Sequence, residues 1–289
     1  MSARGRAPGA AAGATNFRLV VLDLDGTLLD SELRIRQQTI AELERVRRQG
    51  VEVMIATGRH HVSAYAYWHQ LALELPAICC NGAYLYDFSA RRPLAGDPLS
   101  HAEACALLAL VRKHRVRTTV YVDEAMVFEG DSPFSPRMVA WAQSLAPALR
   151  PRIERVETFE RLLDAEPRVW KFFASGDDVD AMRAFARDIE AQLGLSCEWS
   201  GECYLDIAHA GNSKGERLAQ WIAGRGIAAE QVIAFGDHHN DRRMLRIAGL
   251  GIAMGNSSPE VQADADWVTG SNDADGIASA LRRFIPLRG

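Results

Sequence analysis

An apolar stretch at residues 17–22, FRLVVL, leads directly into the acidic segment DLDGT at residues 23–27. A short apolar run that ends in a glycine-containing turn is typical of a parallel strand buried on both faces. Ligands bind beyond the carboxyl ends of such strands, so Asp23 and Asp25 lie where chemistry is expected. The chain is therefore predicted to contain an α/β sheet with an acidic site at one edge.

The segments that follow extend the α/β pattern. Residues 35–49 have helical periodicity and stop before Gly50, and the run VEVMIAT at residues 51–57 indicates a second buried strand. A helical segment at residues 61–73 and an apolar third strand at residues 76–80 come next. Strands that alternate with helices in this way favour a parallel sheet covered by helices.

The middle of the chain has a different pattern, in which helices alternate with pairs of strands. Ser100-x-x-Glu103 is a capping box and predicts the start of a helix. Strand hairpins are predicted around residues 123–124 and around residues 201–202. This mixture favours an α+β unit with an antiparallel sheet.

The first pattern returns after residue 210, with the apolar strand VIAFGD and a helix near the C-terminus. The predicted organisation is a discontinuous parallel-sheet core at residues 17–86 and 210–289, interrupted by an α+β cap at residues 87–209. Residues 1–16 are rich in Ala and Gly and lack the apolar core of a secretory signal, so we expect a disordered tail.

Charge and composition exclude several kinds of partner. The formal net charge of -4 provides no basic field for nucleic acid or an anionic membrane, and no apolar run is long enough to cross a bilayer. The five cysteines have no CxxC spacing and are expected to be reduced thiols. We therefore expect a cytoplasmic protein that binds neither nucleic acid nor a membrane. A monomer or homodimer is expected.

Three further polar segments lie at predicted strand ends or helix starts. ATGR at residues 56–59 ends the second strand, where a hydroxyl and backbone N–H groups can hold phosphoryl oxygens. Lys214 lies in the first turn of a helix that the capping box Ser213-x-x-Glu216 opens. GDHHND at residues 236–241 follows an apolar strand and adds two acidic residues.

Each segment also has a purely structural interpretation: a solvated acidic turn, a Thr-Gly turn, a surface lysine and a capped helix start. Together, however, the four segments supply a nucleophile, oxygen ligands and cationic donors, which suits phosphoryl transfer. The two histidines of GDHHND suggest zinc, but the oxygen ligands favour Mg2+. The sequence has neither G-x-x-x-x-G-K-[ST] nor G-x-G-x-x-G, which argues against nucleoside-triphosphate and dinucleotide enzymes.

In their order along the chain, DLDGTLL, the strand-end Thr57, Lys214 and GDHHND resemble the four motifs of the haloacid dehalogenase superfamily. The insertion after the second motif is similar to that of the Cof-type phosphatases (subclass IIB), whose α+β cap covers the site. The resemblance extends over nearly the whole chain beyond the first sixteen residues. It implies a Rossmann-like, three-layer core with an inserted cap of the C2 type.

The resemblance also implies a role for each motif residue. Asp23 would attack phosphorus and become an aspartyl phosphate, while Asp25 would protonate the leaving oxygen and later activate water. The Mg2+ ligands would be Asp23, the backbone carbonyl of Asp25, Asp237 and, in support, Asp241. The groups that bind phosphate would be the Leu24 backbone, Thr57, Gly58, Lys214 and Asn240.

Several segments are similar to enterobacterial pyridoxal phosphate phosphatases of this subgroup, namely TGRHHV, PAICCNGAYLYD, YVDEAMV, LSCEWS and GNSKG. Pyridoxal 5'-phosphate is therefore the leading substrate, and a sugar-phosphate phosphatase or phosphomutase is the alternative. A non-catalytic protein that binds phosphometabolites is a more remote alternative, because both Asp23 and Asp25 are present. The residues that could contact substrate from the cap or beside it are His60, His61, Asn81, Trp199, Glu202, Cys203 and His209.

Overall fold

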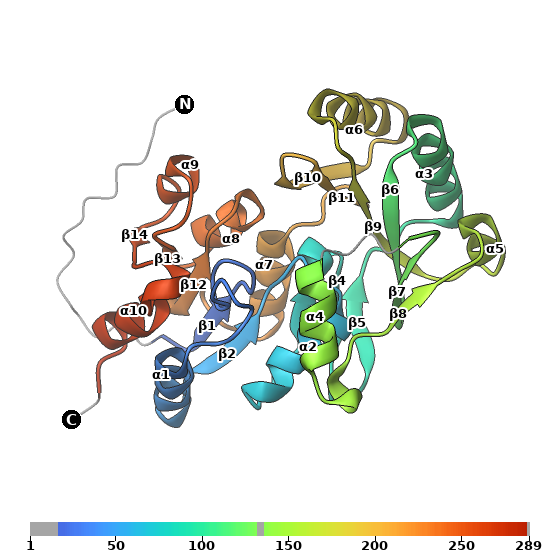
Figure 1. Cartoon of the computed structure of the whole chain (residues 1–289). Coiled ribbons are helices and arrows are strands. Elements are labelled where there is room, and N and C mark those ends of the chain that lie inside the picture. Colours follow the sequence, from blue (N-terminus) through green and yellow to red (C-terminus); the bar gives the residue numbers. More distant parts are fainter. Residues whose placement is uncertain (1–16, 132–135, 288–289) are drawn as a thin grey trace. The chain divides into compact units, whose positions relative to one another are not determined.

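The computed structural model describes residues 17–131 and 136–287 (Figure 1), so the tail predicted at residues 1–16 lies outside the described residues. The chain divides into two compact units. The first unit comprises Met1–Ala56 and Lys214–Gly289, and the second comprises Thr57–Ser213. No helix within the described ranges is long and apolar enough to cross a membrane.

The first unit contains a five-stranded sheet in the order β14-β13-β12-β1-β2, with every neighbouring pair parallel. Its strands are β1 (Leu19–Leu22), β2 (Glu52–Ile55), β12 (Val232–Gly236), β13 (Leu250–Ala253) and β14 (Trp267–Val268). All residues of β1 and β12 are buried, as expected for central strands that are covered on both faces. The predicted parallel sheet is confirmed, and it draws its strands from both ends of the chain.

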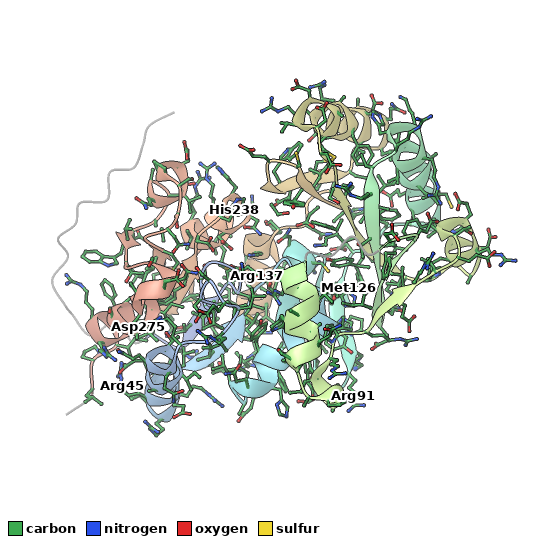
Figure 2. The ribbon with its side chains drawn as sticks, viewed as in Figure 1. Arg45, Arg91, Met126, Arg137, His238 and Asp275 are labelled. Carbon is green, nitrogen blue, oxygen red and sulfur yellow. The ribbon has the colours of Figure 1, made fainter. Side chains whose placement is uncertain are left out.

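Helices cover both faces of this sheet. They are α1 (Gln37–Arg48), α7 (Lys214–Gly224), α8 (Arg242–Ile247), α9 (Pro259–Gln262) and α10 (Gly276–Phe284). The crossovers β1-α1-β2 and β12-α8-β13 run in opposite directions along the sheet, so right-handed connections place α1 and α8 on opposite faces. α1 packs beside α10, where Arg45 donates to the carbonyl of Leu281 (3.2 Å), and α7 packs beside α8 (Figures 1 and 2).

This topology creates a switch point between β1 and β12. The two strands are neighbours and parallel, and the chain leaves their carboxyl ends toward opposite edges of the sheet. A crevice between diverging loops is the usual ligand position in open α/β sheets. The acidic segments that follow β1 and β12 therefore meet at the place where a site is expected.

The second unit contains a six-stranded sheet in the order β10-β11-β9-β6-β7-β8. Its strands are β6 (Arg117–Val122), β7 (Ala125–Phe128), β8 (Ile153–Arg155), β9 (Val169–Ser175), β10 (Ser196–Gly201) and β11 (Tyr204–Ala208). The pairs are antiparallel except for β7 with β8. Apolar side chains of the sheet, such as Val120 and Phe172, form a core with α3 (His101–His114), α5 (Phe159–Asp164) and α6 (Val179–Leu193).

The apolar strand predicted at residues 76–80 does not join the parallel sheet. β3 (Ala77–Cys79) pairs antiparallel with β4 (Tyr84–Asp87), which pairs with β5 (Arg92–Gly96). The chain reverses at Asn81-Gly82, where Asn81 adopts a left-handed φ of 55°. Buried apolar runs occur in both parallel and antiparallel sheets, so the run alone did not reveal the direction of its neighbour, whereas the Asn-Gly pair is typical of a hairpin.

Residues 57–86, which the predicted core includes, lie in the second compact unit. This segment includes α2 (His61–Gln70) and the strands β3 and β4. The helix predicted from the Ser100 capping box is confirmed as α3, with both hydrogen bonds of the box present. The assignment of the two regions as catalytic core and cap stays a prediction.

Gly215 sets how closely α7 approaches α8. A Cβ atom at this position would lie 2.7 Å from the backbone carbonyl carbon of Arg243 in α8, closer than real contacts allow. The absence of a side chain therefore lets the first turn of α7, which begins with Lys214, lie directly against α8. A Cβ atom at Gly224, the last residue of α7, would meet nothing within 4 Å.

We expect Gly215→Ala to lower the free energy of unfolding by about 1–3 kcal/mol, because overpacking outweighs the gain in helix propensity. The matched variant Gly224→Ala should leave stability unchanged or raise it by up to about 1 kcal/mol. Urea denaturation followed by circular dichroism measures both variants. Equal effects of the two substitutions would contradict the close approach of α7 and α8.

Candidate active site

Asp23 follows β1 immediately, and the residue is only 5% exposed. Its backbone N–H donates to the carbonyl of Phe235 in β12 (3.1 Å), which holds it at the switch point between the two strands. β1 ends at Leu22, and Asp25 lies in the turn beyond it, where the residue is exposed. The two carboxylates of the DLDGT segment therefore have different surroundings.

Lys214 is almost completely buried at the start of α7 and contacts two carboxylates. Its Nζ donates to Oδ1 of Asp23 at 2.5 Å and to Oδ1 of Asp241 at 2.8 Å. Burial alone would lower the pKa of Lys214, but the charges of Asp23 and Asp241 raise it above the usual lysine value. The surface-lysine interpretation is thus wrong, and Lys214 is a buried cation.

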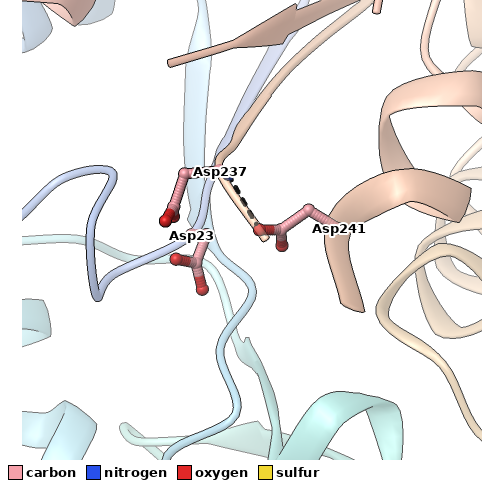
Figure 3. A group of neighbouring side chains, drawn as sticks. All are labelled: Asp23, Asp237 and Asp241. Atoms are coloured by element: carbon pink, nitrogen blue, oxygen red, sulfur yellow. Dashed lines mark hydrogen bonds between the residues drawn. The ribbon is translucent and has the colours of Figure 1, made fainter. Parts of the chain in front are cut away.

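Asp241 joins this group from the turn after β12. Its Oδ2 accepts hydrogen bonds from the backbone N–H groups of Asp237 (3.0 Å) and His238 (3.1 Å), the first of which is the dashed line in Figure 3. One carboxylate oxygen of Asp241 therefore shapes the turn while the other meets Lys214. Asp241 is the N-cap residue of α8, but its side chain caps none of the N–H groups of that helix. It holds the preceding turn and belongs to the charged group instead.

Asp237 links the turn after β12 to the turn after β1. Its Oδ1 accepts a hydrogen bond from Oγ1 of Thr27 (2.6 Å). Gly26 has a φ of +79°, and a Cβ atom there would lie 2.3 Å from Oδ2 of Asp237. Only glycine combines this backbone conformation with so close an approach. The Gly26-Thr27 pair thus positions Asp237, a role that the sequence analysis missed although both residues lie in the DLDGT segment.

The carboxylates of Asp23, Asp237 and Asp241 form a compact group whose candidate ligand oxygens all lie within 4.8 Å of one another (Figure 3). Burial raises the pKa of Asp23 well above its usual value, against the opposing charge of Lys214. Burial and then the charge of Asp241 raise the pKa of Asp237 to about 7. When all three carboxylates are ionised, one lysine leaves this group with surplus negative charge. An all-oxygen donor set with surplus negative charge fits a hard divalent cation such as Mg2+.

The remaining residues predicted in these two segments lie beside the charged group. Leu24 is fully buried, and its carbonyl accepts from the backbone N–H groups of Thr27 (3.2 Å) and Leu29 (2.9 Å). Asn240 is half-buried in the short helical turn His239–Asp241. The sequence therefore identified the residues that the first unit brings together, apart from Thr27 and Gly26.

Thr57 and Gly58 belong to the second unit. Thr57 is buried, its N–H donates to the carbonyl of Ile78 (2.8 Å), and its Oγ1 accepts from the N–H of Arg59 (3.1 Å). A Cβ atom at Gly58 would lie 2.9 Å from Oδ1 of Asn81. The local backbone is thus tightly packed, and the phosphate-binding role of Thr57 and Gly58 stays a prediction.

The other residues considered as substrate contacts differ in burial. His60, His61 and Asn81 are buried, whereas Trp199, Cys203 and His209 are half-buried and Glu202 is exposed. Lys171 and Asp206, which belong to none of the predicted motifs, form a buried ion pair at 2.7 Å in the second unit. A charged residue inside the apolar strands VWKFFAS and YLDIA was the signal that could have identified them.

The chain matches the family model of haloacid dehalogenase-like hydrolases over residues 20–281. It is 42% identical over 264 residues to the pyridoxal phosphate phosphatase YbhA of Escherichia coli, covering 91% of this chain and 97% of that protein. A haloacid dehalogenase-like hydrolase from Bacteroides thetaiotaomicron has the same fold, with a TM-score of 0.80, 26% identity and coverage of 92% and 99%. A subclass IIB sugar phosphatase of this superfamily matches with a TM-score of 0.76, 24% identity and coverage of 93% and 100%.

We expect Lys214→Met to lower the free energy of unfolding by about 3–5 kcal/mol, because it leaves Asp23 and Asp241 buried without their cation. The control is Arg225→Met, which breaks a solvent-exposed ion pair with Glu52 (2.9 Å) in the same unit and should cost at most about 1 kcal/mol. Chemical denaturation in EDTA measures both variants. A similar loss in both would contradict the charge-balancing role of Lys214.

Proposed function

The chain belongs to the haloacid dehalogenase-like hydrolases and hydrolyses phosphate monoesters, and we propose that it is a magnesium-dependent phosphatase of pyridoxal 5'-phosphate. The superfamily inferred from the four motifs is confirmed by the family model. The shared fold of a subclass IIB phosphatase agrees with the Cof-type subgroup inferred from the insertion after the second motif. The observation that supports the substrate is the 42% identity to the pyridoxal phosphate phosphatase of Escherichia coli, spread over 97% of that enzyme. The cytoplasmic location and the oligomeric state stay predictions.

The chemistry starts at Asp23, the buried carboxylate at the switch point. Lys214 holds Oδ1 of Asp23 at 2.5 Å, which fixes the carboxylate and leaves Oδ2 for attack on phosphorus. A bond forms between Oδ2 and phosphorus while the bond from phosphorus to the ester oxygen breaks. Asp25 gives its proton to the departing alcohol, and Asp23 becomes an aspartyl phosphate.

Hydrolysis of the aspartyl phosphate returns the site to its starting state. Asp25, now a carboxylate, takes a proton from the attacking water, and the bond between phosphorus and Asp23 breaks to release phosphate. The exposure of Asp25 supports this part, because an exposed carboxyl can exchange protons with the alcohol and with water. The different surroundings of Asp23 and Asp25 thus match their different roles.

The surplus negative charge of the carboxylate group attracts a divalent cation. Asp23, Asp237 and the backbone carbonyl of Asp25 would hold Mg2+, with Asp241 in support, and the ion would supply positive charge that offsets the phosphoryl group. The ammonium group of Lys214 supplies further positive charge that offsets the phosphoryl group. The Leu24 backbone, Thr57, Gly58 and Asn240 then act as hydrogen-bond donors to the phosphoryl oxygens.

We expect MgCl2 to raise the midpoint of thermal unfolding of the wild type, because an ion that binds only the folded chain stabilises it. Asp237→Asn should abolish this rise and, in EDTA, be at least as stable as the wild type, because one repelling charge is gone. The control Asp264→Asn changes a carboxylate of the first unit that pairs with Arg246 (2.6 Å), and it should keep the rise. A magnesium effect that survives in Asp237→Asn would contradict the metal assignment.

The decisive experiment measures phosphate release from pyridoxal 5'-phosphate, with Mg2+ or with EDTA. We expect Asp23→Asn to reduce kcat on the order of 10^4-fold or more, because the nucleophile is lost. The control Asp264→Asn should retain activity. Release of phosphate from hexose phosphates but not from pyridoxal 5'-phosphate would be consistent with a phosphatase but would contradict pyridoxal 5'-phosphate as its substrate. Full activity in Asp23→Asn would overturn the mechanism.

A further inference from the structure

The second unit contains a buried ion pair that the reaction described above does not use. Lys171 in β9 and Asp206 in the neighbouring strand β11 lie with Nζ and Oδ1 2.7 Å apart. Lys171 is 3% exposed and Asp206 is 7% exposed. Burying two charges is costly unless each finds further partners, so the partners of this pair indicate what it holds in place.

One partner of Lys171 is the backbone of the predicted phosphate-binding segment. Its Nζ donates to the carbonyl oxygen of Gly58 at 2.8 Å, and it also lies over the ring of Tyr121. Burial opposes the charge of Lys171, but the carboxylate of Asp206 raises its pKa above the usual value. The raised pKa keeps the ammonium group a charged donor to Gly58 near neutral pH.

A single planar peptide connects Lys171 to the Thr57 hydroxyl. The carbonyl of Gly58 and the N–H of Arg59 belong to the same peptide unit, so they point in opposite directions and turn together. Lys171 holds the carbonyl on one side, and on the other side the N–H donates to Oγ1 of Thr57 at 3.1 Å. Rotation of this peptide would break both hydrogen bonds at once.

The bond from Arg59 decides how Thr57 can interact with a ligand. A hydroxyl group has one proton and two lone pairs. Because Oγ1 of Thr57 accepts from the N–H of Arg59, its proton is directed away from that N–H. Thr57 is thereby presented as a donor, which is the form that an anionic phosphoryl oxygen requires.

Asn81 closes the network from the opposite side. Its Nδ2 donates to Oδ2 of Asp206 (3.2 Å), and its backbone N–H donates to the carbonyl of Thr57 (3.0 Å). The hydrogen bonds therefore form a ring that runs through Thr57, Gly58, Lys171, Asp206 and Asn81. Every member of the ring lies in the second unit, and the ion pair is its charged part.

We propose that Lys171 and Asp206 are positioning residues for Thr57, which fix the Gly58–Arg59 peptide so that the Thr57 hydroxyl donates to the phosphoryl group. The inference rests on the proposed function, in which Thr57 binds phosphate. Neither residue of the pair needs to touch the substrate. If the pair only stabilised the sheet, its loss would change folding without a specific effect through Thr57.

The first test measures the segment directly, without activity. Lys171→Met removes the donor to Gly58 but leaves Asp206 as an unpaired buried charge. The double variant Lys171→Met/Asp206→Leu removes both charges, so it provides a second variant in case the first does not fold. The matched control is Lys113→Met, which breaks an exposed pair with Asp188 of the same length, 2.7 Å, in the same unit. Amide hydrogen exchange at Arg59 should accelerate in both Lys171 variants and stay unchanged in the control.

The second test is a double-mutant cycle on kcat/KM with Thr57→Val. Loss of one hydrogen bond to a charged group should reduce kcat/KM roughly tenfold to hundredfold, both in Thr57→Val and in Lys171→Met. If Lys171 acts through Thr57, the double variant should be no slower than Thr57→Val alone. Reductions that multiply in the double variant would overturn the proposal.

The two tests separate this inference from the proposed function. A wild type that releases no phosphate from any ester would refute the proposed function, while exchange at Arg59 would still decide whether Lys171 holds the segment. Unchanged exchange at Arg59 in both Lys171 variants would overturn the positioning role, whatever their activity. Faster amide exchange at Arg59, together with non-additive effects in the double-mutant cycle, would establish the positioning role of Lys171 and Asp206.

Discussion

The contact of one buried lysine with two buried carboxylates is the constraint on which the site depends. Lys214 donates hydrogen bonds to Asp23 and Asp241. These three residues come from the start of α7, the end of β1 and the turn after β12. Desolvated charges tolerate little displacement, so the contact demands an accurate arrangement of all three elements. The absence of a side chain at Gly215 meets this demand, because it lets α7 lie against α8.

The two units use buried lysines in different charge balances. Lys171 faces the single carboxylate of Asp206, so that pair is balanced and can serve to hold a backbone segment. Lys214 lies among three carboxylates of the first unit, so its group keeps surplus negative charge. The same residue types thus favour a rigid tether in one unit and a cation site in the other.

The sequence predicted most of this site because its residues follow strong local signals. Asp23 and Asp237 come directly after fully apolar strands, and Lys214 follows a capping box. Parallel strands align their carboxyl ends, so residues more than two hundred positions apart were expected to meet. The third strand was misassigned to the parallel sheet, because an apolar run does not reveal the direction of its neighbour.

By itself, the sequence determined the parallel sheet, the acidic and basic motifs at its edge and the superfamily. Periodicity and strand-end chemistry are local properties of the chain, so no structure was needed to find them. Only the tertiary structure decided that Asp25 is exposed while Asp23 is buried, and that Lys171 reaches the carbonyl of Gly58. Such contacts depend on how side chains pack across distant segments, and the spacing of residues along the chain carries no record of that packing.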